Sequence, residues 1–205
     1  AIRSAGTPWG DRDARQSDRE RSLVDRDAAH AMDDGPSDSL SDEGITEAAF
    51  KAACGRYATG VSVVTTVGTD GHKEGLTVNS FTSVSLDPPL VLFCLDKGAG
   101  SFKGFTHAGR FAVNVLREDQ ADLSTHFAKA GIPDKFAGIK HRTDPDGLPL
   151  LDQVLARIVC EIEHRYEGGD HVILVGRVAR IDLGEESGKP LVYFRGGYGR
   201  FADGA

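Results

Sequence analysis

Strand-length apolar runs repeat along residues 61–195, and tight turns rather than long helices separate most of them. The runs are VSVVTTV (61–67), LVLFCL (90–95), RFAVNVL (110–116), VLARIVCEIEHRYE (154–167), HVILVGRVARIDL (171–183) and PLVYFR (190–195). β-Branched and aromatic residues are frequent in them, as in strands that pack on a core. The turns GTDGH and Gly168-Gly169-Asp170 return the chain as hairpins. The pattern predicts a mainly β, antiparallel sheet that closes into a small barrel, because closure removes exposed edges.

A few short helices are expected beside these strands. Thr46 is a good N-cap for a helix that Thr59-Gly60 ends, and Ser101 caps a second short helix over 101–109. A third helix is expected over 118–128. The helices are too few and too irregularly placed for a doubly wound α/β fold. Residues 130–151 are predicted to form a long irregular loop, which is a common place for function.

Residues 1–43 differ in composition from the rest of the chain. They hold six Arg and eleven Asp or Glu, which gives this segment a net charge of −5 out of −7 for the whole chain. Apolar residues are few and show no sustained period, so the segment does not bury enough surface to offset the entropy of ordering it. We therefore predict a disordered acidic leader over 1–43 and a folded domain over 44–205. A docking arm for another protein is the alternative for the leader.

The charge and the missing motifs exclude several classes of function. A net charge of −7 argues against nucleic acid or an anionic membrane as the main partner, and no apolar run approaches the length of a membrane span. The three widely spaced cysteines, Cys54, Cys94 and Cys160, predict neither a disulfide framework nor a zinc site and favour a reducing cytoplasm. The common hydrolase, zinc-protease and P-loop motifs are missing, and the seven histidines lack ligand spacing, so no metal site is expected.

One stretch between two strands, GLTVNSFTSVSLDPP (75–89), is rich in small polar side chains. Six of its fifteen residues carry a hydroxyl or an amide: Thr77, Asn79, Ser80, Thr82, Ser83 and Ser85. Such groups, together with exposed backbone N–H groups, suit a ligand that needs many neutral hydrogen bonds and a phosphate site. Flavin is such a ligand. A strand with one solvated Ser/Thr face explains the same composition without any ligand.

The blocks GRYATGVSVVTT, GLTVNSFTSVSLDPPLVLFCLDK, FAVNVL, GDHVILVGRV and YFRGGYGRF follow one another in this order along residues 55–201. Over about 45–201 the chain thereby resembles the flavin reductase-like family. It is most similar to the short-chain NAD(P)H:flavin oxidoreductases that serve as the small component of two-component flavin-dependent monooxygenases. The resemblance implies an antiparallel split β-barrel, the FMN-binding split barrel, that forms a homodimer.

The resemblance also implies roles for particular residues. Contacts with the flavin ring and ribityl chain are expected at Thr77, Val78, Asn79 and Ser80, and the same wall continues through Ser83, Val84 and Ser85. The segment after the central strand, with Leu95, Asp96, Lys97 and the helix cap Ser101, is expected near the phosphate. His171 is the predicted catalytic residue, orienting the nicotinamide nucleotide. Arg195 and Tyr198 are expected to contact phosphate or stack on rings, and His126 and Lys135 are further candidates. The Pro88-Pro89 pair is expected to end strand pairing where the ligand enters.

The resemblance implies an enzyme that passes a hydride from NADH or NADPH to FAD or FMN and supplies reduced flavin to a partner monooxygenase. One alternative is a flavin-binding electron carrier or sensor without fast nicotinamide turnover. Another is a related oxidase acting on a phosphorylated pyridoxine-type substrate, which the TVNS and GDH blocks fit less well. The choice of flavin and of nicotinamide nucleotide stays open, since no basic cluster in the sequence marks a 2′-phosphate pocket.

Overall fold

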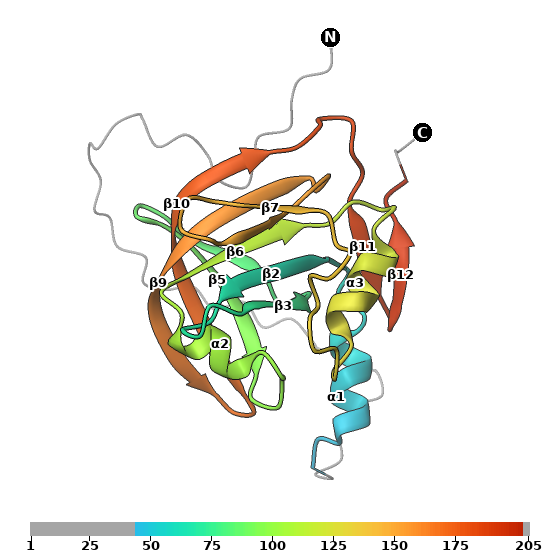
Figure 1. Ribbon diagram of the computed structural model, residues 1–205. Helices are drawn as coiled ribbons and strands as arrows, with labels where there is room; N and C mark the ends of the chain where they lie inside the picture. The colour runs from blue at the N-terminus through green and yellow to red at the C-terminus, as the bar shows by residue number, and fades with distance from the viewer. Residues whose placement is uncertain (1–43, 203–205) are drawn as a thin grey trace, which may run out of the picture. The chain divides into compact units, whose positions relative to one another are not determined.

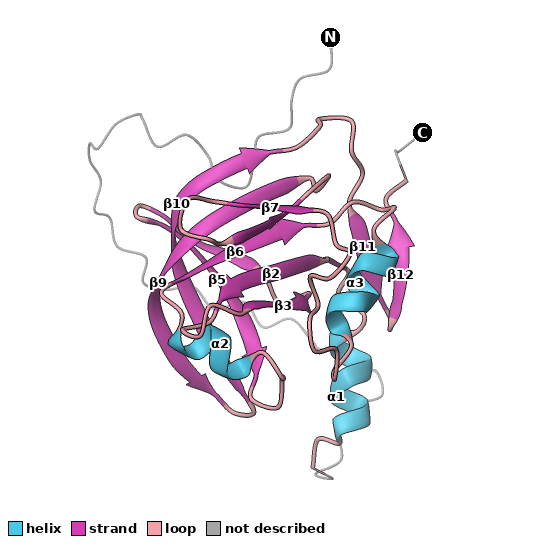
Figure 2. Cartoon of the chain, viewed as in Figure 1, coloured by secondary structure: helices cyan, strands magenta, loops and turns pink. Residues whose placement is uncertain are grey.

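The computed structural model describes residues 44–202, and the predicted leader over 1–43 lies outside the described residues (Figure 1). The helices in this part are α1 (Glu47–Cys54), α2 (Phe102–His107) and α3 (Ala121–Ala128). The strands are β1 (Thr59–Gly60), β2 (Ser62–Val67), β3 (Lys73–Val78), β4 (Thr82–Leu86), β5 (Pro89–Asp96), β6 (Arg110–Val115), β7 (His141–Thr143), β8 (Pro149–Leu151), β9 (Ala156–Gly168), β10 (His171–Leu183), β11 (Leu191–Phe194) and β12 (Gly197–Arg200). Strands therefore dominate the described residues, as Figure 2 shows.

Seven of the strands form one antiparallel sheet in the order β3-β2-β6-β9-β10-β5-β4. Laid flat, strands about 4.8 Å apart would put β3 and β4 roughly 29 Å from each other. Residues 79–81 alone connect these two edge strands, and a link of this length reaches at most about 14 Å. The sheet must therefore curl until its edges approach. The Ser80 hydroxyl accepts a hydrogen bond from the Cys94 N–H at 3.0 Å at this closure. The expected antiparallel split β-barrel is confirmed.

The inside of the barrel is filled by large apolar side chains. Phe93 on β5 meets Phe105 and Phe111 edge-on, with ring centroids 5.7 and 5.1 Å apart. All three rings are fully buried. Gly176 on β10 is required at this point, because a Cβ there would lie 2.5 Å from the Phe111 ring. The helix α2 carries Phe105, so it packs one end of the barrel core.

A second apolar cluster lies between the barrel and α3. It joins Phe127, Phe136, Leu151 and Leu191 to residues at the start of β2. A small sheet in the order β1-β11-β12 lies beside α3, and Figure 1 places α1 below it. The helix α3 and this small sheet carry half of the residues that line the candidate site. Within residues 44–202, no helix is both long and apolar enough to cross a membrane.

Most predicted elements are confirmed within a few residues of their expected ends. The side chain of Thr46 caps α1 by accepting a hydrogen bond from the Ala49 N–H at 3.2 Å. The prediction of an irregular loop over 130–151 is wrong in part, because β7 and β8 form a hairpin there. The sequence signal was weak because each of these strands has three residues, and Pro149 opens the second.

Candidate functional site

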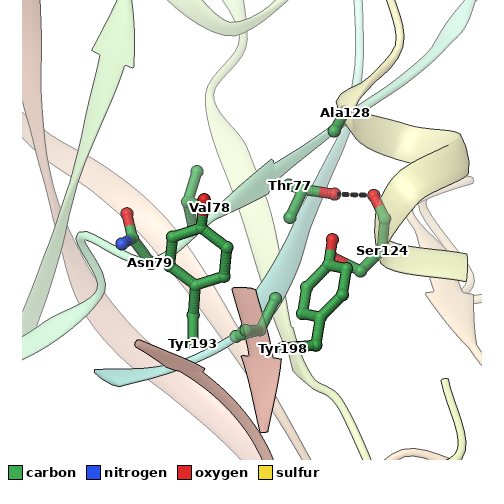
Figure 3. Close-up of a pocket in the computed structure, with 8 residues that line it drawn as sticks. Thr77, Val78, Asn79, Ser124, Ala128, Tyr193 and Tyr198 are labelled. Carbon is green, nitrogen blue, oxygen red and sulfur yellow. Dashed lines mark hydrogen bonds between the residues drawn. The ribbon is translucent and has the colours of Figure 1, made fainter. Parts of the chain in front are cut away.

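A pocket of about 200 Å³ lies where β3 ends against α3 and the small sheet (Figure 3). Its lining combines hydroxyl, amide and aromatic groups from four separate parts of the chain. The lining residues are Val61, Thr77, Val78, Asn79, Ser124, Ala128, Tyr193 and Tyr198. Three neighbouring residues of the TVNS block, Thr77, Val78 and Asn79, thus line one cavity together with Tyr198, and their contact with flavin stays a prediction.

The helix α3 is held over the free edge of β3 by close packing. A Cβ at Gly75 would lie 2.6 Å from the Phe127 ring, so glycine lets the helix approach the strand. Two residues further on, the Thr77 hydroxyl donates to the Ser124 carbonyl oxygen at 2.6 Å (Figure 3). The Thr77 side chain therefore ties the strand to the helix. The Thr77 hydroxyl is thus already engaged, which leaves the Thr77 backbone as the free hydrogen-bonding part of this residue.

The backbone of β3 offers hydrogen-bonding groups at this edge. β3 is the last strand on its side of the sheet. The Gly75 carbonyl oxygen points away from β2, because it accepts a hydrogen bond from Lys135 Nζ at 3.2 Å. Backbone groups of an antiparallel edge strand alternate in direction with a period of two residues, so those of Thr77 point to the same side.

Side chains complete the pocket with two kinds of group. The Tyr198 hydroxyl lies 2.8 Å from the Ser124 hydroxyl, and the Tyr193 and Tyr198 rings meet edge-on at 5.7 Å. The Asn79 amide is exposed and makes no hydrogen bond within the described residues. The pocket can therefore offer an aromatic face and a free amide to a planar ligand with polar edges.

A second cavity, of about 320 Å³, lies near the start of the same strand. His72, Lys73, Glu74, Gly100, Ser101 and residues 130–135 line it. Ser101 is 4% exposed, and its hydroxyl is buried without a hydrogen-bond partner in the described part of the chain. Buried hydroxyls are nearly always paired, so the Ser101 hydroxyl is available to a polar group that enters this cavity. Ser101 stands at the N-cap of α2 but makes no side-chain cap bond.

Lys135 brings a half-buried cation to this second cavity. Its ammonium group donates to the carbonyl oxygens of Phe127 at 2.7 Å and of Gly75 at 3.2 Å. Burial lowers the pKa of Lys135, and the nearby Glu74 carboxylate opposes that shift. Burial likewise raises the pKa of Glu74, and Asp70 adds to the increase. An anion bound here would offset the desolvation of the Lys135 ammonium group.

Other residues of the predicted flavin wall lie apart from these two cavities. The Ser80 hydroxyl bridges the Cys94 backbone, so it serves the barrel closure. Ser83, Val84 and Ser85 lie on β4, which pairs with β5 and leaves Ser83 and Val84 exposed. None of the three lines the pocket that holds Asn79. Pro88 forms the turn between β4 and β5 after a cis peptide bond, and Pro89 begins β5. The prolines therefore form a hairpin turn and do not end the pairing of β4 with β5, whereas a ligand entrance beside them stays a prediction.

The predicted phosphate segment and His171 gather at the turn between β9 and β10. Leu95 is fully buried in the barrel core, and the Asp96 carboxylate accepts a hydrogen bond from the Gly98 N–H. The Lys97 ammonium group donates to Glu167 at 2.6 Å and to the Gly169 carbonyl oxygen at 2.7 Å, and Lys97 does not line the cavity that holds Ser101. His171 Nδ1 lies 2.7 Å from the Asp170 carboxylate, which lowers the pKa of Asp170. His171 does not line the pocket at the end of β3.

Arg195 lies in the two-residue turn between β11 and β12. Its φ of 49° is in the left-handed region, and Gly196 follows with a φ of 80°. Its guanidinium group stacks over the Phe194 ring at 5.0 Å. Its backbone N–H donates to the Gly55 carbonyl oxygen at 2.8 Å, which ties this turn to the end of α1.

Sequence reasoning did not single out Ser124, Ala128 and Tyr193 as site residues. Ser124 and Ala128 are small residues four positions apart, so they share one face of α3 and leave room beside β3. That spacing was a usable signal. Nothing in the sequence says which strand this face covers, because α3 and β3 are 43 residues apart.

Comparisons with known proteins agree with this geometry. The family model described as "Flavin reductase like domain" matches residues 54–202. A probable flavin reductase of Rhizobium meliloti is 47% identical over 150 residues, which are 73% of this chain and 47% of that protein. The chain thus spans about half the length of that relative. The reductase subunit HsaB of a flavin-dependent monooxygenase from Rhodococcus jostii is 40% identical, over 78% of this chain and 80% of its own.

A solved structure of a relative has a similar fold. The NADH:FAD oxidoreductase SgcE6 of Streptomyces globisporus C-1027, in complex with NAD and FAD fragments, superposes with a TM-score of 0.71. It is 36% identical in sequence, and the match covers 76% of this chain and 92% of that one.

Proposed function

The chain belongs to the flavin reductase-like family, and from this premise we propose that it uses NADH or NADPH to reduce free FAD or FMN. The single observation that carries the proposal is the pocket at the end of β3, in which the TVNS backbone, a free amide and two tyrosines meet. The reaction class is inferred from the relatives, and the pocket is the proposed binding site for the flavin ring in this chain.

The residues present fit a flavin. The ring has polar edges and an apolar face, and the pocket pairs the backbone of Thr77 and the Asn79 amide with Val78 and Tyr193. The second cavity fits the phosphate that ends the ribityl chain, since it holds an unpartnered hydroxyl on Ser101 and a cation on Lys135. Thr77 and Lys73 are four residues apart on one strand, roughly 13 Å at about 3.3 Å per residue. A flavin along β3 would therefore extend from one cavity toward the other.

Flavin supplies the chemistry by accepting a hydride at N5 from C4 of the nicotinamide. The chain has to align the two rings near contact distance, and alignment accounts for much of the rate increase in such reactions. Backbone N–H groups near Thr77 would hold the polar edge of the ring. Asn79 would fix the orientation of the ring, and Tyr193 would limit its tilt.

His171 and Lys97 are proposed to support binding of the nicotinamide nucleotide and not to contact the flavin ring. They lie at the β9–β10 turn, where Asp170 orients the His171 ring. From there His171 would hold the nicotinamide nucleotide rather than transfer a proton, as the resemblance implies. Leu95 and Asp96 would support this turn through their strand, and Ser83 to Ser85 would have no direct contact with flavin in the same subunit.

The decisive test uses purified protein with NADH and, separately, NADPH, each with FAD, FMN or no flavin. Loss of the near-ultraviolet absorbance of the reduced nicotinamide that is fast, saturable and dependent on added flavin would support the reductase. No loss from a folded protein that binds flavin would overturn the proposal and leave the electron carrier or sensor. The same assay decides which flavin and which nucleotide the enzyme uses.

The proposal includes two protein partners. HsaB is the reductase subunit of a flavin-dependent monooxygenase, and a monooxygenase component would likewise be the partner here and receive the reduced flavin. A second copy of the chain would form a homodimer, because large apolar side chains are exposed on the sheet. They are Val84, Leu86, Tyr166, Ile181 and Leu183. Light scattering of the purified protein would reveal a mass of two chains. The three free cysteines support a reducing compartment such as the cytoplasm.

A further inference from the structure

Lys73 brings a second ammonium group to the cavity that holds Ser101. It stands at the start of β3 and lines this cavity together with Glu74 and Lys135. Glu74 and Lys135 carry opposite charges, so the net positive charge that these three side chains give the cavity comes from Lys73. Binding of an anion in the cavity therefore depends on where the Lys73 ammonium group is held.

His141 on β7 is the partner that holds this ammonium group. Lys73 Nζ lies 2.8 Å from His141 Nε2, and a lysine ammonium group can only donate a hydrogen bond. His141 Nε2 must therefore accept, which places the imidazole proton on Nδ1. The other side of the ring requires the same tautomer, because Nδ1 lies 2.7 Å from the Ile139 carbonyl oxygen, which can only accept. Two independent contacts thus assign one neutral tautomer to His141.

The His141 ring is held by groups that belong to the folded core. Its backbone pairs with that of Leu151 in the β7–β8 hairpin, and Leu151 is fully buried. The Phe136 ring is buried as well and meets the His141 ring edge-on, with centroids 5.1 Å apart. Because both the backbone and the ring of His141 are supported, its Nε2 atom is a fixed point that orients the Lys73 side chain.

This support matters because a lysine side chain is flexible. An exposed lysine samples many rotamers, and fixing it when an anion binds costs conformational entropy. The bond to His141 restrains Lys73 before the anion arrives and uses one ammonium hydrogen, so the others remain for a ligand. Lys135 is restrained in the same way, since its ammonium group donates to the carbonyl oxygens of Phe127 and Gly75.

We propose that His141 is a positioning residue, which holds the Lys73 ammonium group at the cavity so that it binds the phosphate of the flavin. This inference rests on the proposed function, which places that phosphate beside Ser101. His141 itself does not line the cavity and acts through Lys73. Its effect should therefore be confined to phosphorylated flavin and should vanish when Lys73 is removed. A purely structural tie between β3 and β7 would instead affect all flavins alike.

The test is isothermal titration of FMN and, separately, riboflavin into wild type, His141→Leu, Lys73→Met and the double variant. We expect each single variant to weaken FMN binding about fivefold and to leave riboflavin binding within about twofold, because only FMN carries the phosphate. The loss in the double variant should be no larger than in Lys73→Met, since His141 acts through that side chain. His141→Gln keeps an acceptor near the position of Nε2 and should restore most of the FMN affinity.

Lys140→Met is the matched control. Lys140 is exposed, adjoins His141 in the chain and does not line the cavity. Its removal takes away the same charge as Lys73→Met without touching the pair, so FMN affinity should stay within about twofold of wild type.

Three results would overturn the inference. One is a double variant in which the FMN losses of the two single variants multiply, because His141 would then act independently of Lys73. Another is an equal loss of FMN and riboflavin binding in His141→Leu, which would make His141 a structural residue. The third is a wild type that binds FMN no more tightly than riboflavin. These titrations need no turnover, so failure of the proposed function shows separately, as a wild type that does not oxidise NADH or NADPH with any flavin.

Discussion

The stretch 75–89 contains two polar runs of similar composition, and the structure gives them opposite surroundings. Thr77 to Asn79 end strand β3 beneath α3, where a helix and two tyrosines enclose them. Ser83 to Ser85 lie on β4, with β5 on one side, and Ser83 and Val84 are exposed. Both runs belong to edge strands of the same sheet. The comparison indicates that the edge of β3 forms a pocket because α3 and the two tyrosines pack over it, whereas Ser83 and Val84 on β4 stay exposed.

The largest expected effect comes from Asn79. Asn79→Leu keeps the size of the side chain and removes the free amide, so polar atoms of the flavin lose their partner. We expect kcat/KM for flavin to fall at least tenfold, on the order of a lost hydrogen bond that leaves a buried polar group unpaired. Steady-state kinetics with varied flavin would measure this. An unchanged value would break the assignment of flavin to this pocket.

A variant of Lys135 tests whether the cavity near the start of β3 binds the flavin phosphate. Lys135→Met should reduce the preference for FMN over riboflavin about tenfold, because only FMN carries the phosphate. The pH dependence follows from the lowered pKa of Lys135. The ammonium form binds phosphate below this pKa and is lost as pH rises through it, so FMN affinity should fall at alkaline pH.

Riboflavin is the internal control for Lys135, since its affinity should stay flat over the same pH range. A pH profile of FMN binding that is identical in wild type and Lys135→Met would contradict a phosphate contact at this cavity.

Thr77→Val should have a smaller effect on binding and a clear effect on stability. It removes the 2.6 Å bond to the Ser124 carbonyl oxygen, which is expected to cost about 1 kcal/mol of unfolding free energy. Flavin affinity should fall only about threefold, because the ligand meets the Thr77 backbone. Urea denaturation and a flavin titration on the same sample separate the two. A large loss of affinity without loss of stability would mean that the hydroxyl faces the ligand.

The smallest effect is expected at β4. Ser83→Ala and Ser85→Ala should leave kcat/KM for flavin within twofold, because neither hydroxyl lines the pocket. These variants are also the matched controls for Asn79→Leu, as they come from the same stretch of sequence. A tenfold loss of kcat/KM for flavin in either serine variant would contradict the proposal that β3 contacts flavin and β4 does not.

The sequence predicts the barrel because hairpin turns and apolar runs are local signals that tertiary packing reinforces. The family resemblance implies that the TVNS block faces flavin. Thr77, Val78 and Asn79 line one pocket, and their flavin contact stays a prediction. The sequence does not separate β3 from β4, since both carry small polar residues. The cavity around Ser101 also depends on long-range packing, because Lys73 and Lys135 line it from distant segments while Lys97 pairs with Glu167.

Hydrogen–deuterium exchange with and without flavin tests the central claim most directly, because it reports on every backbone amide in one experiment. We predict slower exchange on flavin binding at residues 75–80, in α3 and in β11–β12, and unchanged exchange in β4. Protection of β4 with none near residues 77–79 would contradict the account.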